Sequence, residues 1–240
     1  MIYSREFLEN LAERINKKYF PERLDFPSVL NCYDLLDAVG CDYEWKYVSP
    51  DDSIMGITFF ENGAWPIWPH GTYSEGDLPN YEFFSKGTVV INQRILDSGS
   101  KVAQCRERFV VVHELSHWIK DKQYFEAHPD SITQTCLKND FGKTFWKSNM
   151  SELEIIERQA NYLCAAIHMP RDVIIESFFQ AGRYKNIPQD AIEFKPYMKS
   201  WIAKLAVQFG MNYNPVLYPP QFHNAGRRSS DLPRPFRIFP

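Results

Sequence analysis

Apolar residues recur at helical spacing in two stretches near the N-terminus. The first predicted helix covers residues 4–18, with Ser4 as its N-cap and one apolar side made of Phe7, Leu8, Leu11 and Ile15. The second is expected to open at Pro27 and to end at Gly40, because proline favours the first turn of a helix and glycine favours the position after the last turn. The pattern therefore predicts two amphipathic helices at the start of the chain.

Three short stretches have the pattern of β-strands: residues 43–48, 54–60 and 87–92. Residues 61–86 show no periodicity and are rich in glycine, proline and aromatic residues. Two interpretations remain open for this stretch. It is either a packed surface loop that covers part of the core, or the wall of a cleft that binds a peptide. In the second case His70 or Tyr73 could help to stabilise a tetrahedral intermediate.

Residues 109–119 are apolar nearly all round a helix, yet they contain the sequence His113-Glu-x-x-His117. Residues four apart on a helix lie one above the other, about 6 Å apart, so both imidazoles can bind one metal ion. Glu114 then projects toward the open side of the ion, where it can take a proton from a water molecule. The alternative is a surface helix with two unrelated histidines. Burying these three side chains is costly unless something satisfies them, which favours the metal site.

A catalytic zinc ion usually has three protein ligands, so a third is expected farther along the chain. A helix is predicted from Ser151, which forms a capping box with Glu154, to the break at Pro170. Glu157 on this helix is the candidate third ligand, the alternative being a solvated surface charge. Asn161, one turn later, can bind the second ring nitrogen of a ligand histidine. In zinc peptidases generally the substrate lies along a sheet edge beside the metal, and strand 87–92 is the candidate for that edge.

The segments that follow the motif are less regular. Residues 121–150 carry charges and aromatic residues without a clear period. They are expected to fold over the motif helix or to line the cleft, a lid being the alternative. Further helices are expected at 173–182 and within 191–209, with an interruption at Pro196. The basic, proline-rich tail at 226–240 is expected to be flexible, or else to dock on a partner.

Composition narrows the class of protein. The chain has 240 residues, is 44% hydrophobic and carries a net charge of −3, so it can bury a sizeable core and has no general attraction to nucleic acid or anionic membranes. No run approaches the length of about eighteen apolar residues that a membrane span needs, and no secretion signal is apparent. The five cysteines are scattered, which favours reduced thiols over a disulfide framework or a thiolate zinc site. We expect a soluble cytoplasmic protein.

Three blocks of the sequence resemble the ImmA/IrrE family of zinc metallopeptidases: residues 88–92, 106–117 and 157–170. The family has in these places a strand that ends in Asn, an Arg-x-x-Phe lead into HELGH, and a later helix of the pattern E-x-x-A-N/D. The resemblance covers about residues 4–210. It implies a small gluzincin-like domain with His113, His117 and Glu157 as zinc ligands and Glu114 as general base. Members of this family typically cleave a helix-turn-helix repressor and so switch on mobile-element or stress genes.

The chain differs from the family pattern in three respects. Ser116 stands where the family usually has Gly, and residues 61–86 and 121–150 lengthen the loops that flank the cleft. The third difference follows the segment 202–211, which resembles the start of a helix-turn-helix. The next helix of that motif is broken up by Pro215, Pro219 and Pro220. These prolines argue against direct nucleic-acid binding by the segment.

We therefore expect an α+β, zincin-like domain over residues 1–170, with a small mixed sheet and an HExxH active-site helix. A helical extension with degenerate helix-turn-helix character follows over 171–225, and then the tail. The expected function is that of a zinc-dependent endopeptidase that cleaves a DNA-binding repressor, without a membrane partner. Two alternatives remain. One is a metal-stabilised binding module that sequesters a repressor without cleaving it, and the other is a general cytosolic zinc peptidase.

Overall fold

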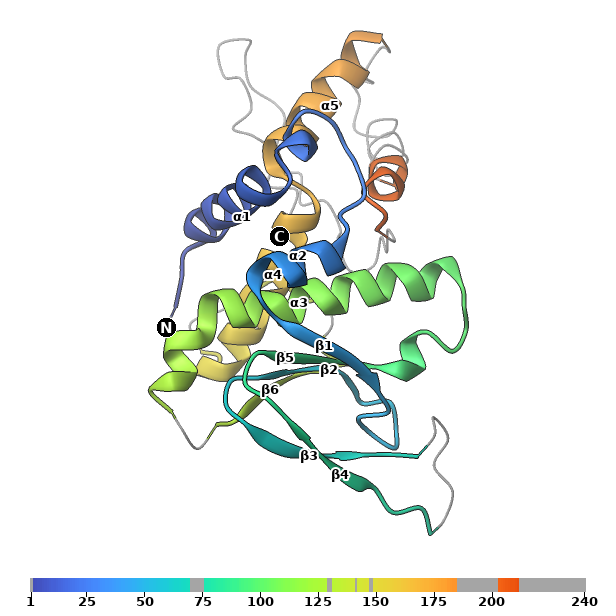
Figure 1. The fold of residues 1–240 in the computed structure, drawn as a ribbon. Coiled ribbons are helices and arrows are strands. Elements are labelled where there is room, and N and C mark those ends of the chain that lie inside the picture. The colour runs from blue at the N-terminus through green and yellow to red at the C-terminus, as the bar shows by residue number, and fades with distance from the viewer. Residues whose placement is uncertain are drawn as a thin grey trace.

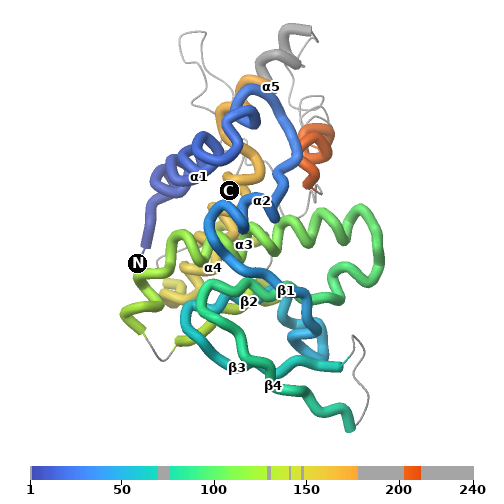
Figure 2. The backbone as a smooth tube through the Cα atoms, viewed as in Figure 1, coloured from blue at the N-terminus to red at the C-terminus, as the bar shows by residue number. Residues whose placement is uncertain are grey.

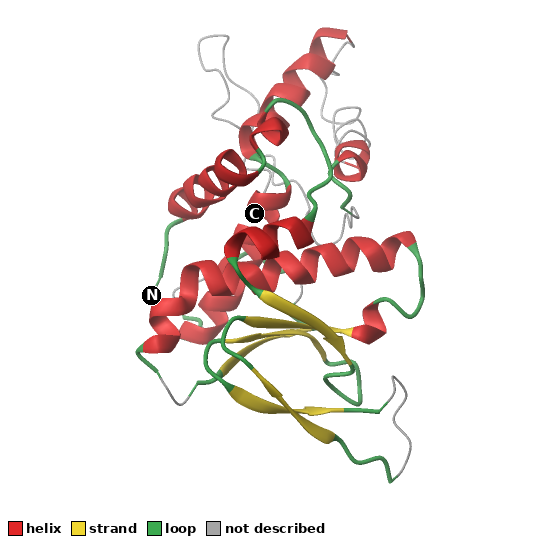
Figure 3. Cartoon of the chain, in the orientation of Figure 1, coloured by secondary structure: helices red, strands yellow, loops and turns green. Residues whose placement is uncertain are grey.

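The computed structural model describes residues 2–69, 76–128, 131–140, 142–146, 149–184 and 203–211. Helices and strands gather in separate parts of the molecule (Figure 3), so the fold is of the α+β class, as predicted. The α-helices are α1 (Arg5–Tyr19), α2 (Cys32–Val39), α3 (Lys101–Glu126), α4 (Glu152–His168) and α5 (Arg171–Tyr184), and residues 203–208 are also helical. The strands are β1 (Asp42–Lys46), β2 (Ile54–Phe59), β3 (Gly63–Ile67), β4 (Asn80–Phe84), β5 (Thr88–Asn92) and β6 (Thr133–Leu137).

Four strands form a small mixed sheet in the order β1-β5-β2-β6. β1 runs parallel to β5, and β2 runs antiparallel to both β5 and β6. The strand predicted at 87–92 is therefore paired on both sides, and the expectation that it forms an edge for a substrate was wrong. The edges of this sheet are β1 and β6, because strand order depends on long-range pairing rather than on position in the sequence.

Both faces of the four-stranded sheet are covered. Figure 1 shows α3 lying across one face, with α1, α2 and α4 on the same side, and the β3–β4 hairpin on the other. Val89 and Ile91 of β5 pack into the cluster that contains α3, whereas Val90 packs with residues of the hairpin. Burial on both sides explains why all five residues of β5 are buried.

The predicted N-terminal helices are present, with one boundary moved. Ser4 caps α1 through its side chain, which accepts a hydrogen bond from Phe7 N at 3.1 Å. α2 ends at Gly40, whose φ of 79° lies in the left-handed region that glycine adopts most easily. α2 begins at Cys32 rather than near Pro27. Asn31, which precedes it, has an extended backbone with φ of −78° and ψ of 99°.

The N-terminal segment anchors α4, the helix that carries Glu157. Asn16 Nδ2 donates to Ile167 O at 3.1 Å, and Arg23 donates to Ile167 O at 3.1 Å and to His168 O at 2.7 Å. These carbonyl groups at the C-terminus of α4 have no partner within the helix itself. The other end of α4 carries the predicted capping box of Ser151 and Glu154. Both ends of α4 are therefore fixed. Figure 2 traces the backbone through α1 and α4.

Two stretches expected to lack regular structure contain strands. Residues 61–86 include β3 and β4, which form an antiparallel pair, and residues 121–150 include the end of α3 and the edge strand β6. His70, Tyr73, Pro196 and the tail at 226–240 lie outside the described residues. In the part of the chain that the structure describes, no helix combines the length and the apolar character needed to cross a membrane.

Candidate metal centre

Several polar side chains of α3 lie in the interior of the protein, among them the two histidines and the glutamate of the HExxH pattern. The helix begins after Ser100, whose hydroxyl accepts a hydrogen bond from Ala103 N at 3.1 Å. It then runs beneath the sheet, and His113, Glu114 and His117 are each 0% exposed. The nearly all-round apolar character of this segment predicted such burial. Interior imidazoles and carboxylates need partners, and these partners define the site.

The structure brings His113, His117 and Glu157 together. Nε2 of His113 lies 3.1 Å from Nε2 of His117. Glu157 of α4 places Oε1 3.1 Å from His117 Nε2 and Oε2 3.4 Å from His113 Nε2. The ligand atoms of the three residues all lie within 4.8 Å of one another, so this group could hold a metal ion. The spacing of four residues on α3 and the packing of α4 against α3 together produce the cluster.

The donor set fits a divalent cation. Two imidazole nitrogens and one carboxylate are the ligands of many zinc sites, and they also suit other first-row metals. Glu157 Oε2 is buried and has no hydrogen-bond partner among the described residues. A cation between the three groups would satisfy this oxygen and separate the two imidazole lone pairs.

Asn161 fixes the tautomer of His113. Asn161 Oδ1 lies 3.1 Å from His113 Nδ1 and accepts a hydrogen bond from Gly142 N at 3.1 Å, while its Nδ2 donates to Asp140 O at 2.9 Å. These two contacts orient the amide so that its oxygen faces the imidazole. His113 Nδ1 therefore carries the proton, and the Nε2 lone pair points into the cluster. Asn161 was predicted to hold a ligand histidine in this way.

Each of the other two candidate ligands also has an outer partner. Asp121 Oδ2 lies 2.8 Å from His117 Nδ1, and Lys120 Nζ contacts the same oxygen and donates to Ile156 O at 3.2 Å. Gln134 of β6 donates its side-chain amide to Glu157 Oε1. Sequence reasoning missed Asp121 and Gln134. Asp121 follows His117 by four residues and could have been found by spacing, whereas nothing local connects Gln134 with Glu157.

Glu114 sits between the metal cluster and the sheet. Thr58 Oγ1 of β2 lies 2.6 Å from Glu114 Oε2 and 3.0 Å from Glu114 O. Burial raises the pKa of this carboxyl from 4.5 to about 8, although the nearby His117 and the Thr58 hydrogen bond act in the opposite direction. A carboxyl group with such a pKa can take up and release a proton near neutral pH.

In the absence of a metal, the charge of Glu157 is balanced by a proton on His117. Burial lowers the pKa of His117, but the charge of Glu157 and the hydrogen bond that His117 donates to Asp121 outweigh it and raise that pKa to about 9. Burial lowers the pKa of His113. Burial would raise the pKa of Glu157, but the facing His117 and His113 lower it well below its usual range. A metal ion bound in the cluster would therefore have to displace the proton of His117 and take its place opposite Glu157.

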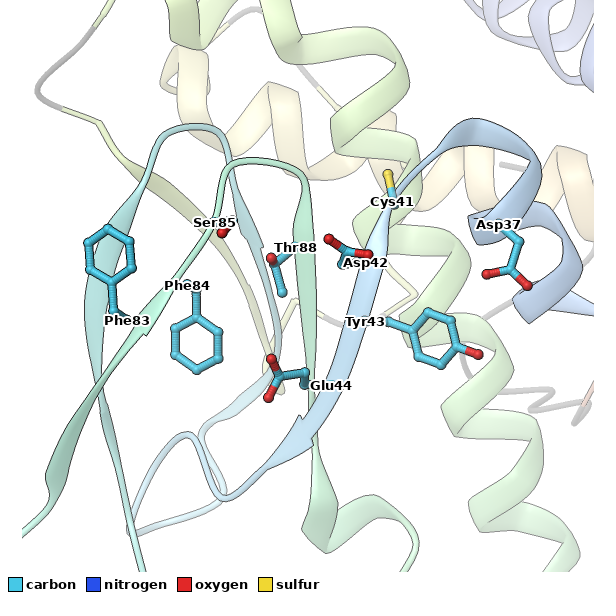
Figure 4. A pocket seen from close by; sticks show the side chains of 9 residues that line it. All are labelled: Asp37, Cys41, Asp42, Tyr43, Glu44, Phe83, Phe84, Ser85 and Thr88. Carbon is cyan, nitrogen blue, oxygen red and sulfur yellow. The ribbon is translucent and has the colours of Figure 1, made fainter.

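A separate cavity of about 380 Å³ lies at the β1 edge of the four-stranded sheet (Figure 4). Carboxylates of β1 and aromatic rings of β4 gather there. It is lined by Asp37, Cys41, Asp42, Tyr43, Glu44, Phe83, Phe84, Ser85 and Thr88. None of the candidate metal ligands lines this cavity, so it is not part of the metal centre.

Comparison of the sequence with protein-family models found no match, and comparison with curated proteins found none either. The geometry of the buried side chains is therefore the structural evidence that bears on function. His113, His117 and Glu157 could hold a metal ion, and Glu114 lies beside them.

Proposed function

We propose that this protein is a zinc-dependent endopeptidase with a zincin-like fold. The observation that carries the proposal is the position of Glu114, a fully buried carboxyl directly beside the cluster of His113, His117 and Glu157. A purely structural zinc site does not need such a base. The resemblance of the sequence to ImmA/IrrE peptidases supports the same proposal.

Zinc bound by the three candidate ligands would supply a Lewis acid that polarises a peptide carbonyl and lowers the pKa of a water molecule. Glu114 accepts the proton of the attacking water and later gives it to the departing amine. Thr58 holds Glu114 in place through the contact of 2.6 Å to Oε2. Asn161 and Asp121 keep the Nδ1 atoms of the two histidines protonated, so that both Nε2 atoms remain available as ligands.

The edge strand β6 offers a place for a peptide. β6 pairs with β2 on one side, and no strand among the described residues pairs with its other side. An extended peptide can add to such an edge through main-chain hydrogen bonds. Gln134 of β6 contacts Glu157, so a peptide on this edge would pass close to the metal centre. The proposed substrate is a DNA-binding, helix-turn-helix repressor, an assignment that rests on the family resemblance.

One observation favours a second function, that of a metal-stabilised binding module that sequesters a repressor. His113, Glu114 and His117 are 0% exposed and Glu157 is 8% exposed, so the centre is enclosed in this structure. A peptidase must open this enclosure before a peptide bond can reach the ligands, whereas a binding module need not.

Glu114→Gln separates the two functions. The amide keeps the size of the side chain but cannot accept the proton, and loss of a general base alone lowers rates by about 10²–10⁴-fold. Zinc-loaded wild type and variant would be incubated with a candidate helix-turn-helix repressor and with casein, while bound zinc is measured. We expect the wild type to cut the repressor at one or a few sites and the variant to keep its zinc and lose cleavage. Equal cleavage by both proteins would contradict the proposed mechanism.

A further inference from the structure

Cys136 brings a sulfur atom to the metal centre. One ring nitrogen of His113, one carboxylate oxygen of Glu114 and Sγ of Cys136 lie within 4.8 Å of one another, and all three residues are fully buried. His113 also belongs to the group with His117 and Glu157, so the two groups overlap in one residue. The scattered cysteines had argued against a thiolate site, but here the other ligands come from α3 rather than from a second cysteine.

The sheet directs Cys136 toward α3. Cys136 of β6 lies opposite Gly56 of β2 in the antiparallel pair, and residues opposite each other across such a pair point to the same side of the sheet. At residue 56 that side is occupied by Glu114, because a Cβ atom there would stand 2.6 Å from Glu114 Oε1. Gln134, two residues before Cys136, points to the same side and contacts Glu157.

One carboxylate oxygen of Glu114 is available as a metal ligand. Thr58 contacts Oε2, whereas Oε1 is buried and makes no well-formed hydrogen bond among the described residues. The backbone N–H of Cys136 faces the same carboxylate and lowers its pKa, which places Cys136 beside Glu114. A buried oxygen without a well-formed hydrogen bond costs free energy that a cation beside it would recover. Cys164 makes a useful comparison, since it is equally buried but donates its S–H to Phe109 O at 3.3 Å and belongs to neither group.

We propose that His113, Glu114 and Cys136 form a second site for a thiophilic divalent cation, such as Zn²⁺, Co²⁺ or Cd²⁺. A sulfur ligand favours softer ions, and its thiol proton passes to solvent when the ion binds. Because the sites share His113, only one of them is filled at a time. One consequence rests on the proposed function: an ion in the second site takes up Glu114, so an excess of such an ion inhibits cleavage, and Cys136→Ser relieves the inhibition.

The test is a Co²⁺ titration of the full chain followed by near-ultraviolet absorption, in which a thiolate ligand produces a charge-transfer band. His117→Ala and Glu157→Gln each remove one ligand of the first site and none of the second. We expect both variants to show the sulfur-to-cobalt band at saturating Co²⁺. Adding Cys136→Ser to either variant should abolish the band, whereas adding the matched change Cys164→Ser should leave it.

The outcomes distinguish this site from the proposed function. Bound Co²⁺ without a sulfur band in either variant would overturn the second site and leave the peptidase proposal standing. A sulfur band that depends on Cys136, in a protein that cleaves no repressor, would establish the second site and overturn the function. A chain that binds no Co²⁺ in any form would overturn both. Glu157→Gln is close in size to the native residue and decides the question if His117→Ala does not fold.

Discussion

The carboxylate of Glu114 occupies the space that a side chain at position 56 would need. A Cβ atom on Gly56 would stand 2.6 Å from Glu114 Oε1 and 2.8 Å from Val110 Cγ1. Real Cβ atoms do not approach other atoms so closely, and one of these groups would have to move. β2 is irregular here, since its register with β6 shifts between Ile54 and Gly56. Glycine in a strand often marks such a close approach.

Gly56→Ala is therefore expected to displace Glu114 without removing a metal ligand. Overpacking a buried position costs about 1–3 kcal/mol, so the free energy of unfolding should fall by about that amount. Cleavage should fall by more than the loss of folded protein explains, while zinc content stays at the wild-type level. Zinc analysis, urea unfolding and the repressor assay measure these three quantities.

Gly99→Ala is the control for this change. Gly99, unlike Gly56, has a positive φ, of 58°, and nothing lies within 4 Å of the position of its Cβ atom. The substitution strains the backbone without touching Glu114, so stability should fall while the activity per folded molecule is kept. Equal loss of activity in both variants would show that Gly56 does not act through Glu114.

The candidate site was partly predictable because its ligands lie on helices. A spacing of four residues identifies His113 and His117 from local sequence. A capped helix with Glu157 and Asn161 one turn apart identifies the candidate third ligand and the outer partner of a histidine. The contacts from strands were not predictable in the same way. Thr58 and Gln134 reach the site only because β2 and β6 pair beside α3, and strand pairing is a long-range property.

Individual strands were misread for similar reasons, although the α+β class and the small mixed sheet were predicted. β6 is a short strand whose sequence, Thr-Gln-Thr-Cys-Leu, has little of the apolar alternation that predicts a strand, because its two faces are only partly buried. β3 contains Pro66, which argues against a strand interior. Among the described residues β3 pairs with β4 alone, so it is an edge strand and can place proline there. The strand at 87–92 has all five residues buried, which is typical of a central strand rather than an edge.

Asn161→Ala should weaken zinc binding without removing a direct ligand. The variant loses the oxygen that holds the Nδ1 proton of His113, so the ring can rotate or change tautomer. Loss of an outer partner of this kind typically lowers metal affinity by about 10–100-fold. Competition with a chromophoric chelator measures the change. Asn80→Ala, an exposed position on β4, is the control and should leave the affinity unchanged.

His168 makes the metal-free protein less stable in mild acid. It is fully buried, its Nε2 donates to Arg108 O at 3.1 Å, and burial lowers its pKa from 6.5 to about 3. At a pH between about 3 and 6.5, His168 is protonated in the unfolded chain but not in the folded chain. Stability from this residue is therefore complete above pH 6.5 and falls with pH, by up to about 1.4 kcal/mol per unit.

His168→Gln tests this dependence, because glutamine can donate to Arg108 O but does not titrate. Urea unfolding of both proteins, kept free of metal with a chelator, would be compared at pH 7 and pH 5. The wild type should lose about 2 kcal/mol more than the variant between these pH values. The same pH dependence in both proteins would show that His168 is protonated in the folded state.

The last prediction concerns two glutamates on α4 that lie three residues apart. Glu157 faces His113 and His117, whereas Glu154 is exposed and bonds to Ser151 in the capping box. The comparison is made in a Cys136→Ser chain, so that only the site with His117 can bind. There Glu157→Gln replaces a charged ligand by a neutral one, and zinc affinity should fall by more than the roughly 10–100-fold typical of an outer partner.

Glu154→Gln should leave the zinc affinity intact and lower only the stability of the helix start. Its cost is expected to be about 0.3–1 kcal/mol, the effect of one negative charge in the first turn, because Ser151 still caps the helix and glutamine can also close a capping box. Chelator competition gives the affinities, and thermal unfolding gives the stabilities. If Glu154→Gln released the zinc while Glu157→Gln retained it, the assignment of the third ligand would be wrong. The proposed peptidase would then lose the group that joins α4 to the metal centre.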